Sequence, residues 1–168
     1  MRDFLPEIEH PATRIGMKPD LYDALARVAD DLASGKIRHH RFPRGLSGGM
    51  DLSTIPPGHS FNMEYWNRSE SCGTVLCIAG WVEAMIGAER HLNLLYGYCD
   101  LSLELRWQLE KLYFPFNSWV KAPCAWNDIT PNQAAAAIRG LLATGKTDWR
   151  KAISEKQSRL GESPNQDR

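Results

Sequence analysis

A chain of 168 residues has the length of one globular domain, and folding at this length buries roughly 70% of the unfolded surface, so its core needs no disulfide or metal. Hydrophobic residues make up 43% of the chain and charged residues 24%, a composition that excludes wholesale disorder. With 20 basic and 20 acidic side chains the formal net charge is zero, so no global field attracts nucleic acid or an anionic membrane.

The N-terminal sequence and the number of cysteines indicate a reducing, cytoplasmic compartment. The first residues contain no apolar signal segment, and no apolar run is long enough to span a membrane. Four cysteines, at positions 72, 77, 99 and 124, are too few for a disulfide scaffold in a chain of this length. We therefore expect a soluble cytoplasmic protein with reduced thiols, no membrane contact and no cofactor.

The first regular element in chain order is a helix over about 19–34. Residues 1–17 carry two prolines and no hydrophobic period, which predicts an N-terminal arm that becomes ordered only if it docks. Pro19 suits the first position of the helix, and Gly35 is placed to be its left-handed cap. Apolar residues recur at spacings of four and three, at Leu21, Leu25, Val28 and Leu32.

Residues 36–71 are interrupted by glycines and prolines and predict irregular structure. Short strands over 38–42 and 60–65 would pair as a minor β-hairpin. The start of this segment is basic and offers candidate anion-binding residues, namely Lys36, Arg38, His39, His40, Arg41 and Arg44. The alternative interpretation, a solvated basic loop, is the one we favour.

A second helix is predicted over about 74–88. Its broad apolar face combines Cys77, Trp81 and Met85 with Ile78, Val82 and Ile86. Glu83 is the one carboxylate within this helix, and it could be a buried general base beside the small residues Gly80 and Gly87. The interpretation we favour places Glu83 on a solvent-facing strip.

Three further helices complete the predicted fold. Ser102 caps a helix that buries Leu105, Leu109, Leu112 and Phe116 and ends at Pro115. Thr130 and Gln133 form a capping box for a helix through Leu142 that Gly145 ends, and a last short helix begins at Thr147 or Asp148. We expect a mainly α fold, a compact single-domain orthogonal bundle of four to six helices over 18–154, with a frayed polar tail over 155–168.

Cys72 is the candidate for chemistry, because it stands at the predicted start of the second helix. Free amides and the helix dipole stabilise a thiolate at such a position, and His59 could act as its base. The same position also suits a structural cysteine. The thiols of Cys72 and Cys77 lie about 140° apart on an ideal helix, and no Cys-x-x-Cys pair is present, so we expect no metal site.

Six tryptophans, at positions 66, 81, 107, 119, 126 and 149, could line an aromatic pocket for a flat ligand. In their hydrophobic contexts we favour core positions for them. Phosphate-binding loops, dinucleotide fingerprints and nucleophile elbows are absent.

Cys72-Gly73-Thr74 followed by Cys77-Ile78-Ala79-Gly80-Trp81 resembles a signature of small uncharacterised bacterial and phage proteins. The resemblance extends over about 59–150. It implies a single intact domain and a bacterial or phage origin, and it brings no activity with it.

Three functions of different classes follow from these patterns. The first is a helical accessory module that binds a protein partner or assembles with itself, since no convergent catalytic set accompanies the abundant aromatic residues. The alternative is a thiol-dependent hydrolase or acyl-transfer enzyme that uses Cys72 and His59. A weaker alternative is nucleic-acid binding through 36–44, against which the zero net charge argues. We favour the non-enzymatic function.

Overall fold

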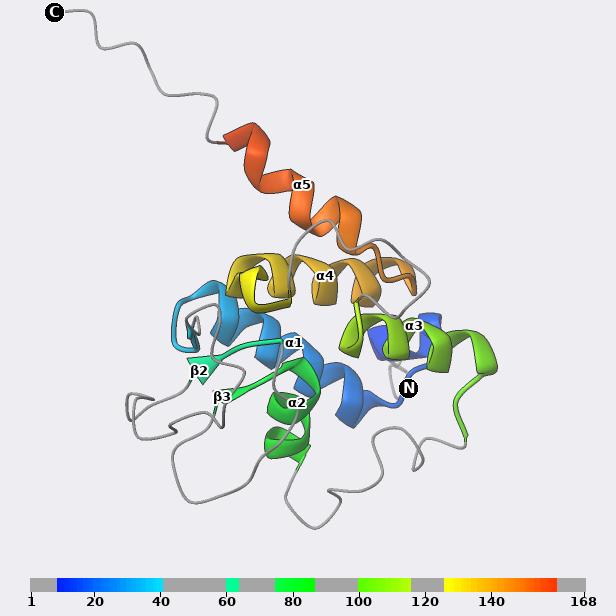
Figure 1. Cartoon of the computed structure of the whole chain (residues 1–168). Helices are drawn as coiled ribbons and strands as arrows, with labels where there is room; N and C mark the ends of the chain where they lie inside the picture. Colours follow the sequence, from blue (N-terminus) through cyan, green and yellow to red (C-terminus); the bar gives the residue numbers. More distant parts are fainter. Residues whose placement is uncertain (1–8, 41–59, 64–74, 87–99, 116–125, 160–168) are drawn as a thin grey trace, which may run out of the picture.

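The computed structural model describes residues 9–40, 60–63, 75–86, 100–115 and 126–159 (Figure 1). Within these ranges the elements follow in this order: the 3-10 helix η1 (Pro11–Ile15), α1 (Pro19–Ala33), β1 (Arg38–His39), β2 (Ser60–Phe61), β3 (Val75–Leu76), α2 (Ile78–Ile86), α3 (Leu103–Tyr113), the 3-10 helix η4 (Trp126–Asp128), α4 (Pro131–Thr144) and α5 (Trp149–Arg159). The predicted mainly α fold with a minor β component is confirmed.

Helix α1 lies at the centre of the fold, between α4 and α2 (Figure 1), and it packs against both. It begins with Pro19 at its first position, and it ends one residue before Ser34, followed by Gly35 at a φ of 76°. Only glycine adopts this left-handed backbone at low cost, so the glycine fixes where the chain leaves the helix. The buried face is the predicted one and consists of Leu21, Ala24, Leu25, Val28, Ala29 and Leu32.

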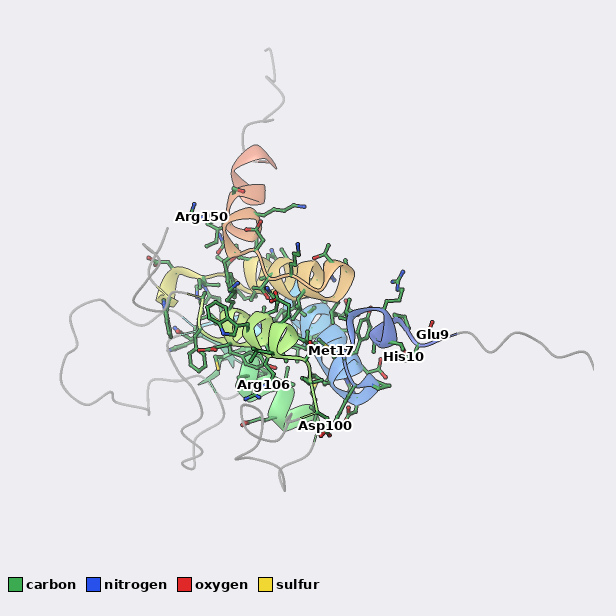
Figure 2. The ribbon with its side chains drawn as sticks, turned by 90° about the vertical axis from the view of Figure 1, so that its right-hand side faces the viewer. Glu9, His10, Met17, Asp100, Arg106 and Arg150 are labelled. Carbon is green, nitrogen blue, oxygen red and sulfur yellow. The ribbon has the colours of Figure 1, made fainter. Side chains whose placement is uncertain are left out.

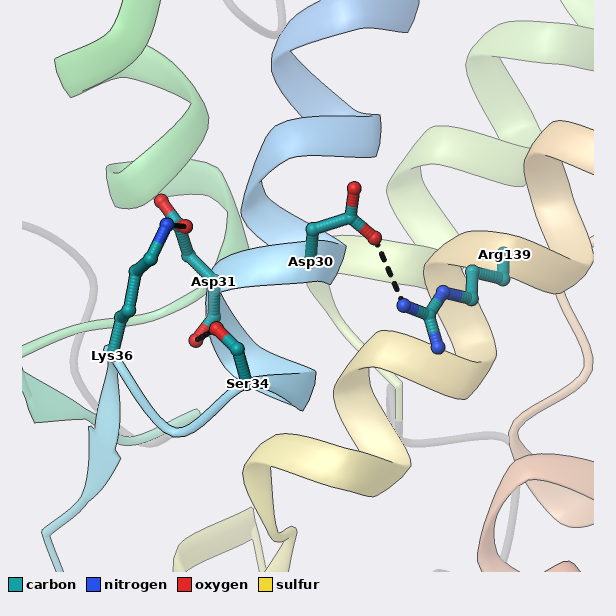
Figure 3. A network of polar contacts seen from close by, with 5 residues as sticks. All are labelled: Asp30, Asp31, Ser34, Lys36 and Arg139. Carbon is teal, nitrogen blue, oxygen red and sulfur yellow. Dashed lines mark hydrogen bonds and ion pairs between the residues drawn. The ribbon is translucent and has the colours of Figure 1, made fainter.

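Helix α4 covers α1 and begins with the predicted capping box. The Gln133 backbone N–H donates to the Thr130 hydroxyl at 3.3 Å, and the Thr130 N–H donates to Gln133 Oε1 at 2.8 Å, which satisfies two amides that the first turn would leave unpaired. Gly145 ends the helix at a φ of 71°. On the surface, Arg139 of α4 donates to Asp30 of α1 at 2.9 Å (Figure 3).

The β-structure is a three-stranded parallel sheet in the order β1-β2-β3, and the predicted hairpin is wrong because a hairpin is antiparallel. Arg38 pairs with Ser60, and Ser60 pairs with Val75. Parallel strands need connections of a dozen or more residues, and the segments between these strands have that length. The sequences of two short strands do not reveal their relative direction, which explains the error.

Helix α2 begins at Ile78, four residues after the predicted start at Thr74. The predicted start is wrong because Val75 and Leu76 are paired in the sheet as β3, where their backbone amides and carbonyls find partners. Positions 87 and 88, at the predicted end, lie outside the described residues.

Both ends of the described chain extend the predicted domain. The described part of the predicted arm packs against the helices, since Ala12 and Met17 are buried in the core. The His10 Nδ1 atom accepts the Ala12 N–H at 3.2 Å and so caps η1. At the other end, α5 continues to Arg159, past the predicted boundary at 154. No helix within the described ranges is both long and apolar enough to cross a membrane.

The packing of α4 on α1 predicts a large effect for Ile138→Ala. Ile138 is 0% exposed, so the truncation leaves a cavity in the core and should lower the free energy of unfolding by roughly 2–5 kcal/mol. Arg139→Ala, one residue away, removes only a surface ion pair with Asp30 and should change it by about 1 kcal/mol or less. Chemical denaturation measures both values, and equal effects would contradict this assignment of the core.

Candidate functional site

The predicted thiol site lies largely outside the part of the chain that the structure describes, because Cys72 and His59 are both outside it. The cysteine at the start of α2 is Cys77 instead. It directly precedes Ile78, and its carbonyl oxygen accepts the Trp81 N–H at 3.1 Å, as the first bond of the helix. The motif therefore does place a cysteine at a helix entry, but the residue is the second cysteine.

The Cys77 thiol is a buried, protonated group. Its residue is 3% exposed, and burial raises the pKa of the Cys77 thiol above its ordinary value. Backbone amides of Gly80 and Ala79 act in the opposite direction by a smaller amount, and the Glu83 carboxylate adds to the increase. Since the thiolate is the nucleophile, this thiol lacks the activation that a catalytic cysteine needs.

Three polar residues lie at the carboxyl edge of the sheet, one directly after each strand. His40, Asn62 and Cys77 each follow a strand, in the order of the paired strands. Asn62 Nδ2 donates to the His40 carbonyl at 2.6 Å, and the His40 N–H donates to the Phe61 carbonyl at 3.0 Å. Burial lowers the pKa of His40, which favours the neutral imidazole.

Ligands of open parallel sheets bind at this kind of edge, so its chemistry matters. The Trp81 indole N–H donates to the Ser60 carbonyl at 3.1 Å and joins α2 to the middle strand. Glu83 is 6% exposed, so the favoured prediction of a solvent-facing carboxylate is wrong, and Ala84 is the exposed neighbour. No group of three or more His, Cys, Asp or Glu residues in the described ranges could hold a metal. These hydrogen bonds make this edge a structural joint between sheet and helix.

The candidate anion-binding residues do not gather into one described patch. The Lys36 ammonium pairs with the Asp31 carboxylate at 2.8 Å, next to the ion pair of Asp30 (Figure 3). Arg38 is exposed, whereas the His39 ring packs beside Phe61 with 6.5 Å between ring centroids. Arg41 and Arg44 lie outside the described residues. The positive charge of Lys36 is therefore offset by a carboxylate of α1, the helix that precedes it.

An exposed apolar pair lies on α3, so the core position favoured for Trp107 is wrong. Leu103 is 75% and Trp107 55% exposed, and among the residues whose side chains the structure describes they are the only large hydrophobic ones with such exposure. The Lys111 ammonium lies 5.0 Å from the centre of the Trp107 ring, a cation–π contact. We define the outer face of α3 as Leu103, Trp107 and the charged residues beside them, Glu104, Arg106, Glu110 and Lys111.

The opposite side of α3 is attached by three hydrogen bonds to the turn after α4 and to the first residue of α5. The Thr147 N–H donates to Gln108 Oε1 at 2.9 Å, and the Thr147 hydroxyl donates to the Gln108 carbonyl at 2.8 Å. The Trp149 indole N–H donates to the Lys111 carbonyl at 2.8 Å. Ser102 caps the helix start, accepting the Leu105 N–H at 3.2 Å, as predicted. The outer face is therefore held on a fixed helix.

The outer face of α3 has exposed charged residues beside it, and an ion pair holds the start of the helix. Figure 2 views the molecule from the side of α3 and shows Arg106 extending from the side of the helix opposite α4. Asp100, just before the helix, pairs with Lys18 at the start of α1, with 2.9 Å between the charged atoms. This ion pair and the three hydrogen bonds tie both the start and the inner side of α3 to other elements.

Comparison with known proteins returns no match: no family model, no curated protein and no solved structure is similar to this chain. The resemblance carried by residues 72–81 therefore stays a prediction. The signal for the outer face of α3 was nonetheless present in the sequence. Leu103 and Trp107 are four residues apart and fall opposite the predicted core positions Leu105, Leu109 and Leu112.

The buried Cys77 thiol should make the free energy of unfolding depend on pH. The unfolded chain releases the thiol proton at a lower pH than the folded chain, so the free energy of unfolding should decline as the pH rises past the ordinary thiol pKa. In Cys77→Ala this part of the decline should be absent. Denaturation of both proteins at a series of pH values between neutral and alkaline checks it, and parallel curves would contradict the burial of a protonated thiol.

The hydrogen bond that attaches α3 to Thr147 should contribute to the free energy of unfolding. Thr147→Val keeps the shape of the side chain but removes the donor to the Gln108 carbonyl, and it should lower the free energy of unfolding by about 1 kcal/mol. The matched control is Thr144→Val, which removes an exposed hydroxyl whose partners are the nearby Gly140 carbonyl and Lys146 N–H and not another helix, and it should cost less. Urea denaturation compares the two, and a larger loss in the control would count against this attachment.

Proposed function

We propose that the chain is a protein-binding module whose contact surface is the outer face of α3. The observation that carries the proposal is the exposure of Leu103 and Trp107, 75% and 55%, one helical turn apart. Single exposed apolar residues are ordinary on protein surfaces. Two adjacent ones that include a tryptophan are of a different kind, because tryptophan is among the residues most enriched at the energetic centres of interfaces.

The way α3 is held supports binding. Gln108 and Lys111 accept hydrogen bonds from Thr147 and Trp149 on the inner side, so the helix need not become ordered when a partner arrives. Binding loses affinity for every group that it must immobilise, and a preorganised surface avoids that loss. The contact between Lys111 and the Trp107 ring restricts the indole in the same way.

The geometry also indicates the chemistry of the partner. Anchors at positions i and i+4 on one helix match the spacing by which amphipathic helices are recognised. Charges of both signs flank the anchors, with Glu104 and Glu110 against Arg106 and Lys111. The partner surface that fits is an amphipathic helix with an apolar strip and with acidic and basic residues on its flanks.

Photo-crosslinking from the centre of the surface tests the proposed function. A benzophenone amino acid in place of Trp107 should yield a discrete protein adduct, in the purified chain or in an extract of the source organism. Adding Leu103→Glu should abolish that adduct, because a carboxylate cannot be desolvated against an apolar strip. The same label at Arg150, which is exposed on α5, is the control. No adduct from position 107, or one unaffected by Leu103→Glu, would refute the proposal.

A further inference from the structure

The charges on the outer face of α3 divide into two flanks. At about 100° per residue, Glu104 and Lys111 fall on one side of the line through Leu103 and Trp107. Arg106 and Glu110 fall on the other side of that line. Each flank therefore carries one acidic and one basic residue. On the first flank, Glu104 and Lys111 lie toward opposite ends of the helix. On the second, Arg106 and Glu110 lie one turn apart.

These flanks are complementary to themselves. When two copies of a helix pair antiparallel about a two-fold axis, each flank meets the same flank of the other copy with its direction reversed. Glu104 then lies opposite Lys111 of the second copy, and Arg106 opposite Glu110 of the second copy. The midpoints of both pairs fall beside Trp107, so one register satisfies all four contacts and places the two indoles at the centre.

We infer that the partner of the outer face of α3 is a second copy of this chain, bound through an antiparallel two-fold pairing of the two α3 helices. The inference rests on the proposed function and names its partner. Neither Arg106 nor Glu110 forms an ion pair with a residue of the described ranges, so both charges are available to the second copy. Antiparallel helices also bring the opposite ends of their dipoles together, which favours this orientation.

The pairing is weak and reversible. Its apolar contact is limited to Leu103 and Trp107 from each copy, and contacts that bury less than about 1,200 Å² belong to the transient class. The dissociation constant should therefore lie between roughly 10 µM and 1 mM. Such a dimer forms and separates with the local concentration of the chain.

A parallel two-fold pairing is the arrangement to be distinguished. In that arrangement the two different flanks meet, with Glu104 opposite Arg106 and Lys111 opposite Glu110 of the second copy. Attraction is also present there, so the native sequence alone does not separate the two arrangements. Exchanging the charges of Glu104 and Lys111 separates them, because it preserves the antiparallel contacts and makes the parallel contacts repulsive.

Sedimentation equilibrium of the full chain, from about 10 µM to about 1 mM, tests the inference. The chain should show a monomer–dimer equilibrium, and Trp107→Ala should weaken it by at least about tenfold. Glu104→Lys alone and Lys111→Glu alone should each weaken it several-fold, and the double variant should recover most of that loss, short of the part that the Lys111–Trp107 contact contributes. Arg150→Glu, an exposed charge reversal on α5, is the control and should leave it unchanged.

Each other result overturns the inference in a distinct way. A chain that stays monomeric to about 1 mM, while position 107 still crosslinks to another protein, removes the second copy as partner but leaves the proposed function standing. A chain that is monomeric and forms no adduct removes both. Dimerisation that the double exchange of Glu104 and Lys111 further weakens shows the parallel arrangement. Circular dichroism of every variant confirms that a lost dimer is not a lost fold, since all the substituted residues are exposed.

Discussion

Burial of α1 is the constraint on which the rest of the structure depends. Its apolar face contacts α4 on one side and α2 on the other, and η1 packs beside it. Leu21, Leu25, Val28 and Leu32 are all buried, and each such side chain stabilises the fold by about 1.5–3 kcal/mol relative to its exposed state. The ends of α1 also set the positions of other elements, because Gly35 directs the chain into β1 and Lys18 holds the start of α3 through Asp100.

Local signals in the sequence predicted those features of the fold that depend on residues close together in the chain. The caps of α3 and α4, the left-handed glycines at 35 and 145 and the buried face of α1 follow from contacts within one or two turns. The direction of the strands did not follow, because pairing of Arg38 with Ser60 and of Ser60 with Val75 is decided by tertiary contacts. For the same reason Val75 and Leu76, apolar enough for a helix, were assigned to one.

The candidate site was predicted less well than the fold, for a related reason. A cysteine near a helix start suggests an activated thiol, but whether it is activated depends on burial, which a single sequence does not display. Cys77 occupies the helix entry and is buried, and desolvation there outweighs the amides that would stabilise a thiolate. Trp107 shows the opposite case: a residue type expected in the core lies on the surface, because Leu105, Leu109 and Leu112 already fill the inner side of α3.

The three short parallel strands have a consequence for how the chain folds. The pairs Arg38–Ser60 and Ser60–Val75 join positions well apart in the sequence, whereas the backbone hydrogen bonds within each helix join residues one turn apart. Closing long loops costs entropy before any strand pairing compensates for it, and folding slows as contacts become less local. Single turns of helix can therefore form before the strands pair, and the joint that fixes α2 through Trp81 and Ser60 needs the paired strands. Before the strands pair, Asn62 and Cys77 are not held at a common edge of the sheet.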